Sequence, residues 1–193
     1  MIWRDTDPDR CGLLPFAFDP EFGYQRYIDW ALDVPMFFVV REGVYHPGDG
    51  TTFREFLSRG FADTRPTMRD WDMHLTTLFP DVRLKRIIEV RGADTVPRAH
   101  ICALPALWKG ILYDTSGLAA TWALLGDMTP DELDQGQLEV ARHGLRGEMG
   151  GKKVLDLARE LVSIAAEGLR RMHVEGLNAV SYTHLTLPTI CSV

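Results

Sequence analysis

The chain has 193 residues and a formal net charge of −6, with 46% hydrophobic and 25% charged residues. These values are ordinary for a globular chain, and the negative charge argues against a general binder of nucleic acid or of anionic membranes. The longest apolar runs, such as residues 36–40, are far too short to cross a bilayer, so we expect no membrane span.

In chain order, the first predicted elements are a helix, a strand and a short helix. Residues 21–32 mix apolar and charged side chains and predict a helix, which Pro35 ends. Residues 36–41 are aromatic and β-branched and predict a strand. The Thr-Phe-Arg-Glu sequence at 52–55 is a capping-box pattern that predicts the start of a short helix.

The remaining pattern is mostly helical. Asp70 is expected to cap a helix that runs through Leu78, and residues 82–91 predict a strand. Thr129, followed by proline and then by an acidic residue at the third helical position, predicts a strong helix start. Further helices are predicted at 104–113, 116–125 and 152–172. Several helices without regular β–α alternation favour an α+β fold, with the strands belonging to an antiparallel sheet that residues outside this chain complete.

The predicted strand 82–91 carries the candidate chemistry. Alternate side chains of a strand share a face, so one face presents Arg83, Lys85, Ile87, Glu89 and Arg91. A carboxylate can bind Mg²⁺, and a guanidinium can hold a phosphate or carboxylate bidentately. The alternative is a solvated strand face with an ordinary Glu–Arg pair, and spacing alone favours it.

The cysteines and the C-terminal residues lead to separate expectations. Cys11, Cys102 and Cys191 form no CxxC pair, and no signal-peptide pattern opens the chain, so we predict a reducing, cytoplasmic setting. Residues 181–193 do not continue the preceding pattern and look like translated sequencing-adapter read-through. We therefore expect residues 1–180 to be the C-terminal portion of a single catalytic domain, followed by a non-native tail.

A long ordered string of residues resembles the plant-type glutamate–cysteine ligase family, which also occurs in bacteria. The resemblance is carried by residues 71–86 (WDMHLTTLFPDVRLKR), 89–94 (EVRGAD) and 101–114 (ICALPALWKGILYD), with 2–3, 6–10 and 32–36 upstream. It implies ATP-dependent joining of glutamate, through a γ-glutamyl phosphate, to the amine of cysteine, the first step of glutathione synthesis. It also implies a fold similar to the catalytic domain of glutamine synthetase, with ATP and Mg²⁺ as cofactors and glutamate and cysteine as substrates.

By position in the motif, the resemblance makes Glu89 the expected Mg²⁺ ligand and Arg91 the expected contact to the transferred phosphoryl group or the γ-carboxylate. Arg83 and Lys85 are candidates for holding the nucleotide, with a solvated face as the alternative. Other candidates are Arg10 as a substrate contact and, for the cysteine pocket, Met36 and Phe38, for which core packing is the alternative. His74 is expected to cap or pack its helix, and Cys102 to be a buried thiol.

The resemblance further implies an N-terminal part, outside this chain, that supplies most acidic Mg²⁺ ligands. We therefore expect the chain alone to be inactive. Residues 95–98 depart from the Gly-Pro-Trp-like stretch of many family members. Two alternatives remain open: a related γ-glutamyl–amine ligase, such as the ergothioneine-pathway enzyme, and a non-catalytic remnant or binding module.

Overall fold

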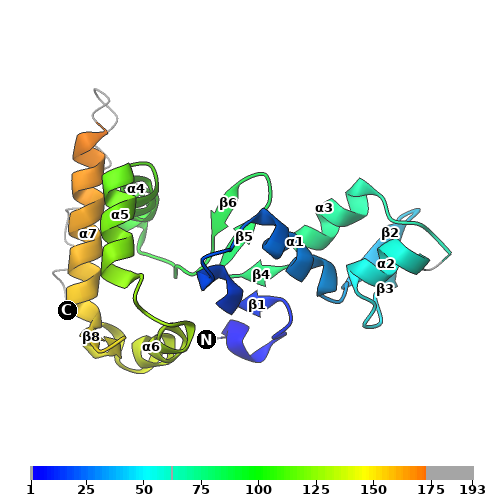
Figure 1. The fold of residues 1–193 in the computed structure, drawn as a ribbon, viewed down its shortest axis with the longest axis horizontal. Coiled ribbons are helices and arrows are strands. Elements are labelled where there is room, and N and C mark those ends of the chain that lie inside the picture. The colour runs from blue at the N-terminus through cyan, green and yellow to red at the C-terminus, as the bar shows by residue number, and fades with distance from the viewer. Residues whose placement is uncertain (1, 62, 173–193) are drawn as a thin grey trace. The chain divides into compact units, whose positions relative to one another are not determined.

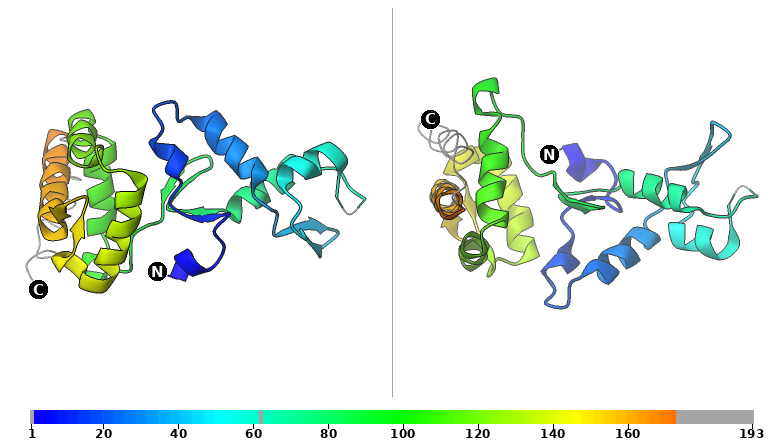
Figure 2. Two further views of the ribbon diagram at one scale, coloured as in Figure 1. Left: turned by 60° about the horizontal axis from the view of Figure 1, so that its bottom comes forward. Right: turned by 90° about the horizontal axis from the view of Figure 1, so that it is seen from above.

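The computed structural model describes residues 2–61 and 63–172, and the chain divides into two compact units, residues 1–93 and 94–193. Short strands and helices mix in the first unit, and helices dominate the second (Figures 1 and 2). This confirms the predicted α+β class. Among the described residues, no helix is long and apolar enough to cross a membrane.

The elements of the first unit are η1 (Ile2–Asp5), β1 (Cys11–Gly12), η2 (Pro15–Phe18), α1 (Tyr24–Asp33), β2 (Phe38–Arg41), β3 (Val44–Pro47), α2 (Phe53–Arg59), α3 (Met68–Thr76), β4 (Phe79–Pro80), β5 (Val82–Leu84) and β6 (Ile88–Val90). Those of the second unit are η3 (Arg98–His100), α4 (Ala103–Leu112), α5 (Thr115–Leu125), α6 (Pro130–His143), η4 (Gly144–Arg146), β7 (Glu148–Met149), β8 (Lys152–Lys153) and α7 (Val154–Arg171). Every predicted helix is present, with ends that differ by a few residues.

Within the described ranges, the strands form four separate two-stranded sheets. The pairs β2–β3, β5–β6 and β7–β8 are antiparallel, whereas β1–β4 is parallel. Each of these strands has one partner among the described residues, so the expected antiparallel sheet, which residues outside this chain would complete, stays a prediction. The glutamine synthetase-like fold stays a prediction.

The predicted strand 82–91 is wrong as a single element, because the chain reverses within it. Strands β5 and β6 pair as a hairpin in which Arg83 faces Glu89. The turn is closed by the Lys85 N–H, which donates to the Ile87 carbonyl at 3.0 Å. The hairpin satisfies backbone groups that a lone strand would leave unpaired, and opposite charges across the pair favour this register.

Capping boxes begin three of the helices. Thr52 and Glu55 form the box of α2, and Thr129 and Glu132 form that of α6, as predicted. The prediction that Asp70 caps α3 is wrong. Thr67 is the N-cap, and Asp70 completes its capping box from the third helical position.

Two apolar clusters stabilise the first unit and hold α1, α2 and α3 around β2. One contains Met36, Val39, Phe53 and Phe56, and the other contains Ala31, Val34 and Leu78. Trp71 of α3 packs against both clusters. The same helix leads into β4 and the β5–β6 hairpin. The two clusters therefore hold in place the helix from which the hairpin follows.

In the second unit, α4 and α7 run side by side in close contact (Figures 1 and 2). Their core contains Ala106, Ile111, Ala165, Ala166 and Leu169. A Cβ on Gly110 would lie 2.1 Å from the Ala165 carbonyl oxygen, and one on Gly168 would lie 2.0 Å from the Gly110 carbonyl oxygen. Only glycine at these two positions allows the backbones to approach so closely.

Candidate functional site

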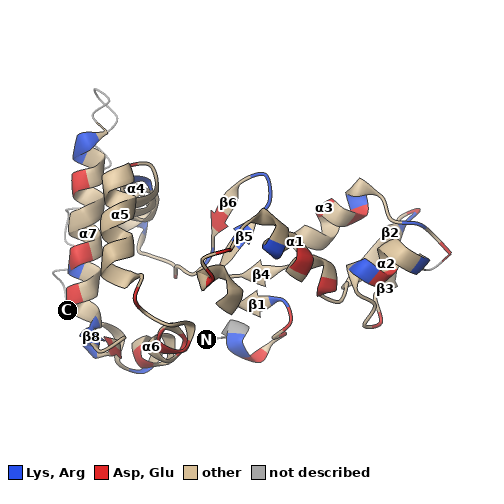
Figure 3. Ribbon diagram, viewed as in Figure 1, with Lys and Arg blue, Asp and Glu red and all other residues tan. Residues whose placement is uncertain are grey.

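The β5–β6 hairpin concentrates charge at the candidate site (Figure 3). The Glu89 carboxylate accepts hydrogen bonds from two arginines. Arg83 donates through Nε at 3.0 Å and Nη2 at 2.7 Å, and Arg91 donates through Nη1 at 2.6 Å. We call Arg83, Glu89 and Arg91 the Glu89 cluster. The prediction that Glu89 and Arg91 lie side by side is confirmed.

The two guanidinium groups keep Glu89 ionised. The hydrogen bond from Arg83 is the largest cause that holds the pKa of Glu89 below its usual value, and Arg91 lowers it further. The Glu89 side chain is about one third exposed. The cluster therefore carries a fixed carboxylate and a net positive charge, which suits an anionic ligand.

The Arg83 guanidinium makes hydrogen bonds both to Glu89 and to backbone carbonyls. Besides binding Glu89, its Nη1 donates to the carbonyl of Thr76 at 2.9 Å and to that of Leu78 at 3.1 Å. Thr76 is the last residue of α3, where helix carbonyls lack intrahelical partners. Arg83 thus connects the end of α3 to Glu89 and fixes the position of this carboxylate.

The Arg91 guanidinium makes one hydrogen bond to Glu89. Its Nη1 binds Glu89, while Nε and Nη2 have no hydrogen-bond partner among the residues that the structure describes. The guanidinium carbon lies 5.5 Å from the centre of the Phe79 ring, and the backbone N–H donates to Asp81. The Nε and Nη2 donors form one edge of the guanidinium and can bind two oxygens of a carboxylate or a phosphate.

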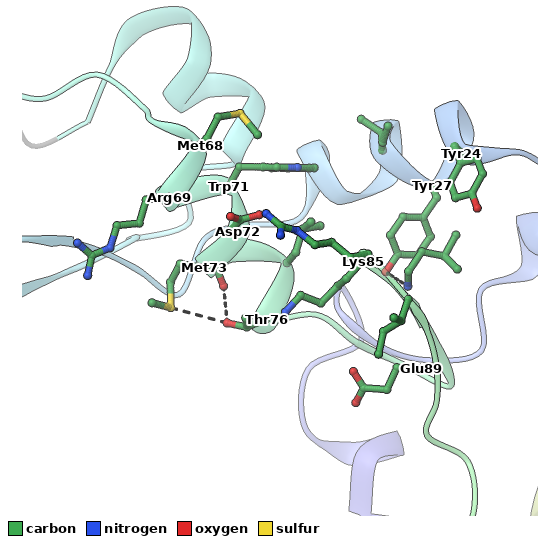
Figure 4. A pocket seen from close by; sticks show the side chains of 15 residues that line it. Tyr24, Tyr27, Met68, Arg69, Trp71, Asp72, Met73, Thr76, Lys85 and Glu89 are labelled. Atoms are coloured by element: carbon green, nitrogen blue, oxygen red, sulfur yellow. Dashed lines mark hydrogen bonds between the residues drawn. The ribbon is translucent and has the colours of Figure 1, made fainter. Parts of the chain in front are cut away.

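Beside this cluster lies a pocket of about 1000 Å³ (Figure 4). Lys85 and Glu89 line it from the hairpin. The other walls come from α1 and α3, through Tyr24, Tyr27, Ile28, Met68, Arg69, Trp71, Asp72, Met73, Leu75 and Thr76. The structure thus brings Lys85 and Glu89 to one cavity that combines aromatic surface with basic groups.

Tyr27 connects α1 to the hairpin. Its hydroxyl accepts a hydrogen bond from the Leu84 N–H at 3.2 Å, and burial raises the pKa of the phenol. Sequence reasoning did not identify the aromatic walls of the pocket. The signal was the helical spacing, because Tyr24, Tyr27 and Ile28 share one face of α1.

Arg10 lies away from this pocket and is 3% exposed. Its guanidinium pairs with Asp7, donates to the Pro35 carbonyl at 2.7 Å and stacks 3.7 Å from the centre of the Phe37 ring. These contacts bind the N-terminal loop to the start of β2. A substrate contact by Arg10 stays a prediction.

Met36 and Phe38 line a second, smaller cavity of about 110 Å³, which His74 also lines. Met36 belongs to the core cluster around Phe53, so it packs in the core, which was the alternative to its role in a cysteine pocket. His74 is buried, and its Nε2 bonds to the Ala31 carbonyl at 2.7 Å. The prediction that His74 packs its helix is therefore confirmed.

The described residues do not by themselves fit a magnesium site. Among them, no group of three or more His, Cys, Asp or Glu residues could hold a metal ion, and both oxygens of Glu89 are bound by arginines. Glu89 could act as a ligand only together with further donors, because one carboxylate supplies too few oxygens for a magnesium site.

Cys102 is exposed, so the prediction of a buried thiol is wrong. It lies at the N-cap of α4, where its backbone begins the helix while its side chain is left outside the core. The residues that this helix buries are Ala103, Ala106, Gly110 and Ile111. The predicted tail at 181–193 lies outside the described residues.

An α+β protein with two arginines around one carboxylate, beside a large pocket, is suited to binding an anionic small molecule. The chain belongs to glutamate–cysteine ligase family 2, whose family model matches residues 1–182. The match includes the first two residues of the segment that we expected to be non-native.

Curated plant proteins are similar over most of the chain. Glutamate–cysteine ligase, chloroplastic, from Solanum lycopersicum is 44% identical over 173 residues, which are 88% of this chain and 33% of that protein. The Brassica juncea protein of the same name is 45% identical over 186 residues, 93% of this chain and 36% of that protein. That of Arabidopsis thaliana is 44% identical over 173 residues, again 88% and 33%. The chain therefore spans about a third of the length of these relatives.

The names of these relatives contradict the predicted cytoplasmic setting. All three are labelled chloroplastic. The prediction was wrong because unpaired cysteines indicate a reducing environment and do not distinguish one reducing compartment from another.

Proposed function

We propose that the chain is part of an ATP-dependent ligase that joins the γ-carboxylate of glutamate to the amine of cysteine through a γ-glutamyl phosphate. The family membership and the names of the plant relatives support the reaction. The observation that supports the site is the position of Arg91: its Nη1 donates to Glu89, while its Nε and Nη2 have no hydrogen-bond partner among the described residues.

In this proposal each charged residue has a separate task. Arg91 binds the γ-carboxylate and then the transferred phosphoryl group, whose oxygens carry the negative charge of the transition state. Glu89 orients Arg91, and Arg83 orients Glu89 through its link to α3. Lys85 lines the 1000 Å³ pocket and is proposed to contact the nucleotide phosphates, with the aromatic walls available to the base.

Mg²⁺ and the glutamine synthetase-like fold belong to the same proposal. Mg²⁺ would neutralise phosphate charge when bound, and its remaining ligands must come from residues that the structure does not describe. Met36 and Phe38 are proposed to line the cysteine pocket. Arg10 is retained as a proposed substrate contact, although its present partners hold it within the unit.

The test measures cysteine-stimulated ADP release by the complete ligase. Arg91→Ala should lower kcat/KM by about 100-fold or more, because it removes preorganised donors from the reacting anion. Arg91→Lys should recover little, since an ammonium cannot present a bidentate edge. Arg59→Ala changes an exposed arginine on α2 and serves as the matched control.

The outcomes separate the alternatives. If both Arg91→Ala and Glu89→Gln lower turnover by less than about tenfold, or 1.4 kcal/mol of barrier, the site is wrongly assigned. If amines other than cysteine stimulate the wild-type enzyme and cysteine does not, the protein is a related γ-glutamyl–amine ligase. If no amine stimulates ADP release, the family member is a non-catalytic remnant or a binding module.

A further inference from the structure

The tip of the β5–β6 hairpin, residues 85–88, has little apolar packing to hold it. Ile87 is 69% exposed, Ile88 is 60% exposed, and Lys85 and Arg86 are exposed as well. A two-stranded hairpin without further burial is only marginally stable in water. The position of the tip therefore depends on contacts that the hairpin makes to other elements.

Hydrogen bonds join the hairpin to two helices. Arg83 donates to two carbonyls at the end of α3. Nearer the tip, the Leu84 N–H donates to the Tyr27 hydroxyl of α1 at 3.2 Å (Figure 4). Successive N–H groups of a strand point to opposite edges, so the Leu84 N–H faces away from β6, whereas the Lys85 N–H closes the turn. Tyr27 thus accepts from a backbone donor that the strand pairing leaves free.

Tyr27 is itself held firmly in the first unit. It is 3% exposed, and its ring packs edge-on against Trp30 with the centroids 5.2 Å apart. Burial is the largest cause that raises the pKa of the phenol, which keeps the hydroxyl neutral. The ring provides the packing, and the hydroxyl provides the bond to Leu84. A change to phenylalanine separates these two contributions.

Lys85, the next residue along the hairpin, lines the 1000 Å³ pocket. Its ammonium group has no ion-pair or hydrogen-bond partner among the residues that the structure describes. Arg69 and Arg86 line the same pocket, together with the rings of Tyr24 and Trp71. Basic groups beside aromatic surface suit a ligand that combines a flat ring with negative charge.

We infer that Tyr27 is a positioning residue for Lys85: its hydroxyl holds the Leu84 backbone and so sets where the Lys85 ammonium group meets an anionic ligand in the pocket. The inference rests on the proposed function, in which that anion is the phosphate chain of ATP. An ammonium group on a flexible four-carbon stem must be ordered when it binds. A fixed backbone lowers this ordering cost, so the contribution of Tyr27 falls on nucleotide binding.

The test is a double-mutant cycle on the complete ligase, measured as the KM for ATP and the kcat of cysteine-stimulated ADP release. Tyr27→Phe should raise the KM for ATP about fivefold, as for loss of one neutral hydrogen bond, and change kcat by less than about twofold. In a Lys85→Ala background the same change should raise the KM by less than about twofold, because Tyr27 acts through Lys85.

The matched control is Tyr113→Phe, which removes the hydroxyl of a tyrosine that is 78% exposed in the second unit and should change neither parameter. Equal increases in KM for Tyr27→Phe with and without Lys85 would overturn the inference, because Tyr27 would then act independently of this lysine. A lower kcat with an unchanged KM would overturn it as well, since the loss would not lie in nucleotide binding.

Amide hydrogen exchange at Leu84 tests the same link without relying on turnover. Tyr27→Phe should speed this exchange about fivefold in the complete ligase without substrates. Binding and anchoring are reciprocal, so ATP should slow exchange at Leu84 in the wild type, a measurement that also serves if the variant does not fold. An unchanged rate in either experiment would contradict the inference.

The failure of the proposed function gives a different result. If the wild-type ligase shows no cysteine-stimulated ADP release, the reaction itself is wrongly assigned, and the role of Lys85 toward ATP fails with it. If the wild type is active and the cycle is additive, only the positioning role of Tyr27 is lost.

Discussion

Glu89 shows how a few residues can set the chemistry of a site. One carboxylate fixes two arginines, but their surroundings make them unequal. Arg83 also reaches the end of α3, whereas Arg91 keeps one donor edge unused among the described residues. The difference lies in local geometry, since both side chains carry the same charge.

Asp70 and Arg41 form a bidentate ion pair elsewhere in the first unit. Arg41 donates to Asp70 through Nη1 at 2.6 Å and Nη2 at 2.9 Å, and the Asp70 side chain is 8% exposed. Burial alone would raise the pKa of Asp70, but the hydrogen bonds from Arg41 and Thr67 outweigh it and hold this pKa below its ordinary value. The pair therefore links stability to pH.

We predict that Asp70→Asn lowers the free energy of unfolding by about 1.5–3 kcal/mol at pH 7, the usual range for a charged hydrogen bond. A lowered folded-state pKa gives stability that is present above the unfolded value and lost as pH falls through the folded value. The gap between wild type and variant should thus narrow below the ordinary pKa of 3.8. Urea unfolding at pH 7 and pH 3 measures it, with Asp9→Asn as an exposed control.

At the scale of elements, local signals placed the helices well. The capping boxes at Thr52 and Thr129 were readable because all their hydrogen bonds lie within four residues. The α3 boundary was misplaced because Asp70 resembles an N-cap, and only the backbone geometry identifies Thr67. The hairpin was missed because its turn contains no glycine or proline to mark it.

The close packing of α4 against α7 leads to a prediction for Gly168. A Cβ here would overlap the Gly110 carbonyl, and relieving the overlap would separate the helices. Gly168→Ala should therefore destabilise the second unit by about 1–3 kcal/mol, despite its better helix propensity. Thermal unfolding measures the loss. Ser163→Ala, at an exposed position of the same helix, should be neutral or slightly stabilising; a stabilised Gly168→Ala would contradict the packing.

At the scale of the whole molecule, the described residues supply only part of the groups that the proposed reaction needs. The described residues contain no group of three metal-ligating side chains, and the chain spans about a third of its plant relatives. The positioning of substrate and charge in the proposed ligation requires several groups that act together.

We predict that the 193-residue chain alone gives no cysteine-stimulated ADP release above the rate without enzyme. The control is the complete ligase assayed at equal concentration. Restoring the rest of the protein should restore turnover in the wild type and not in Arg91→Ala. Activity in the isolated chain would show that its own residues suffice for catalysis and would contradict the need for further metal ligands.

The sequence by itself determined the family, the helices and the presence of Glu89 and Arg91 on one motif. These features depend on local order: helix periodicity, caps and a contiguous string of residues. Only the tertiary structure decided that residues 82–91 form a hairpin and that Arg83 is bonded to the end of α3. It also decided that, among the described residues, the Nε and Nη2 of Arg91 and the buried Nδ1 of His74 have no hydrogen-bond partner. The physical reason is that each of these features depends on contacts between elements, which side-chain spacing along one element cannot specify.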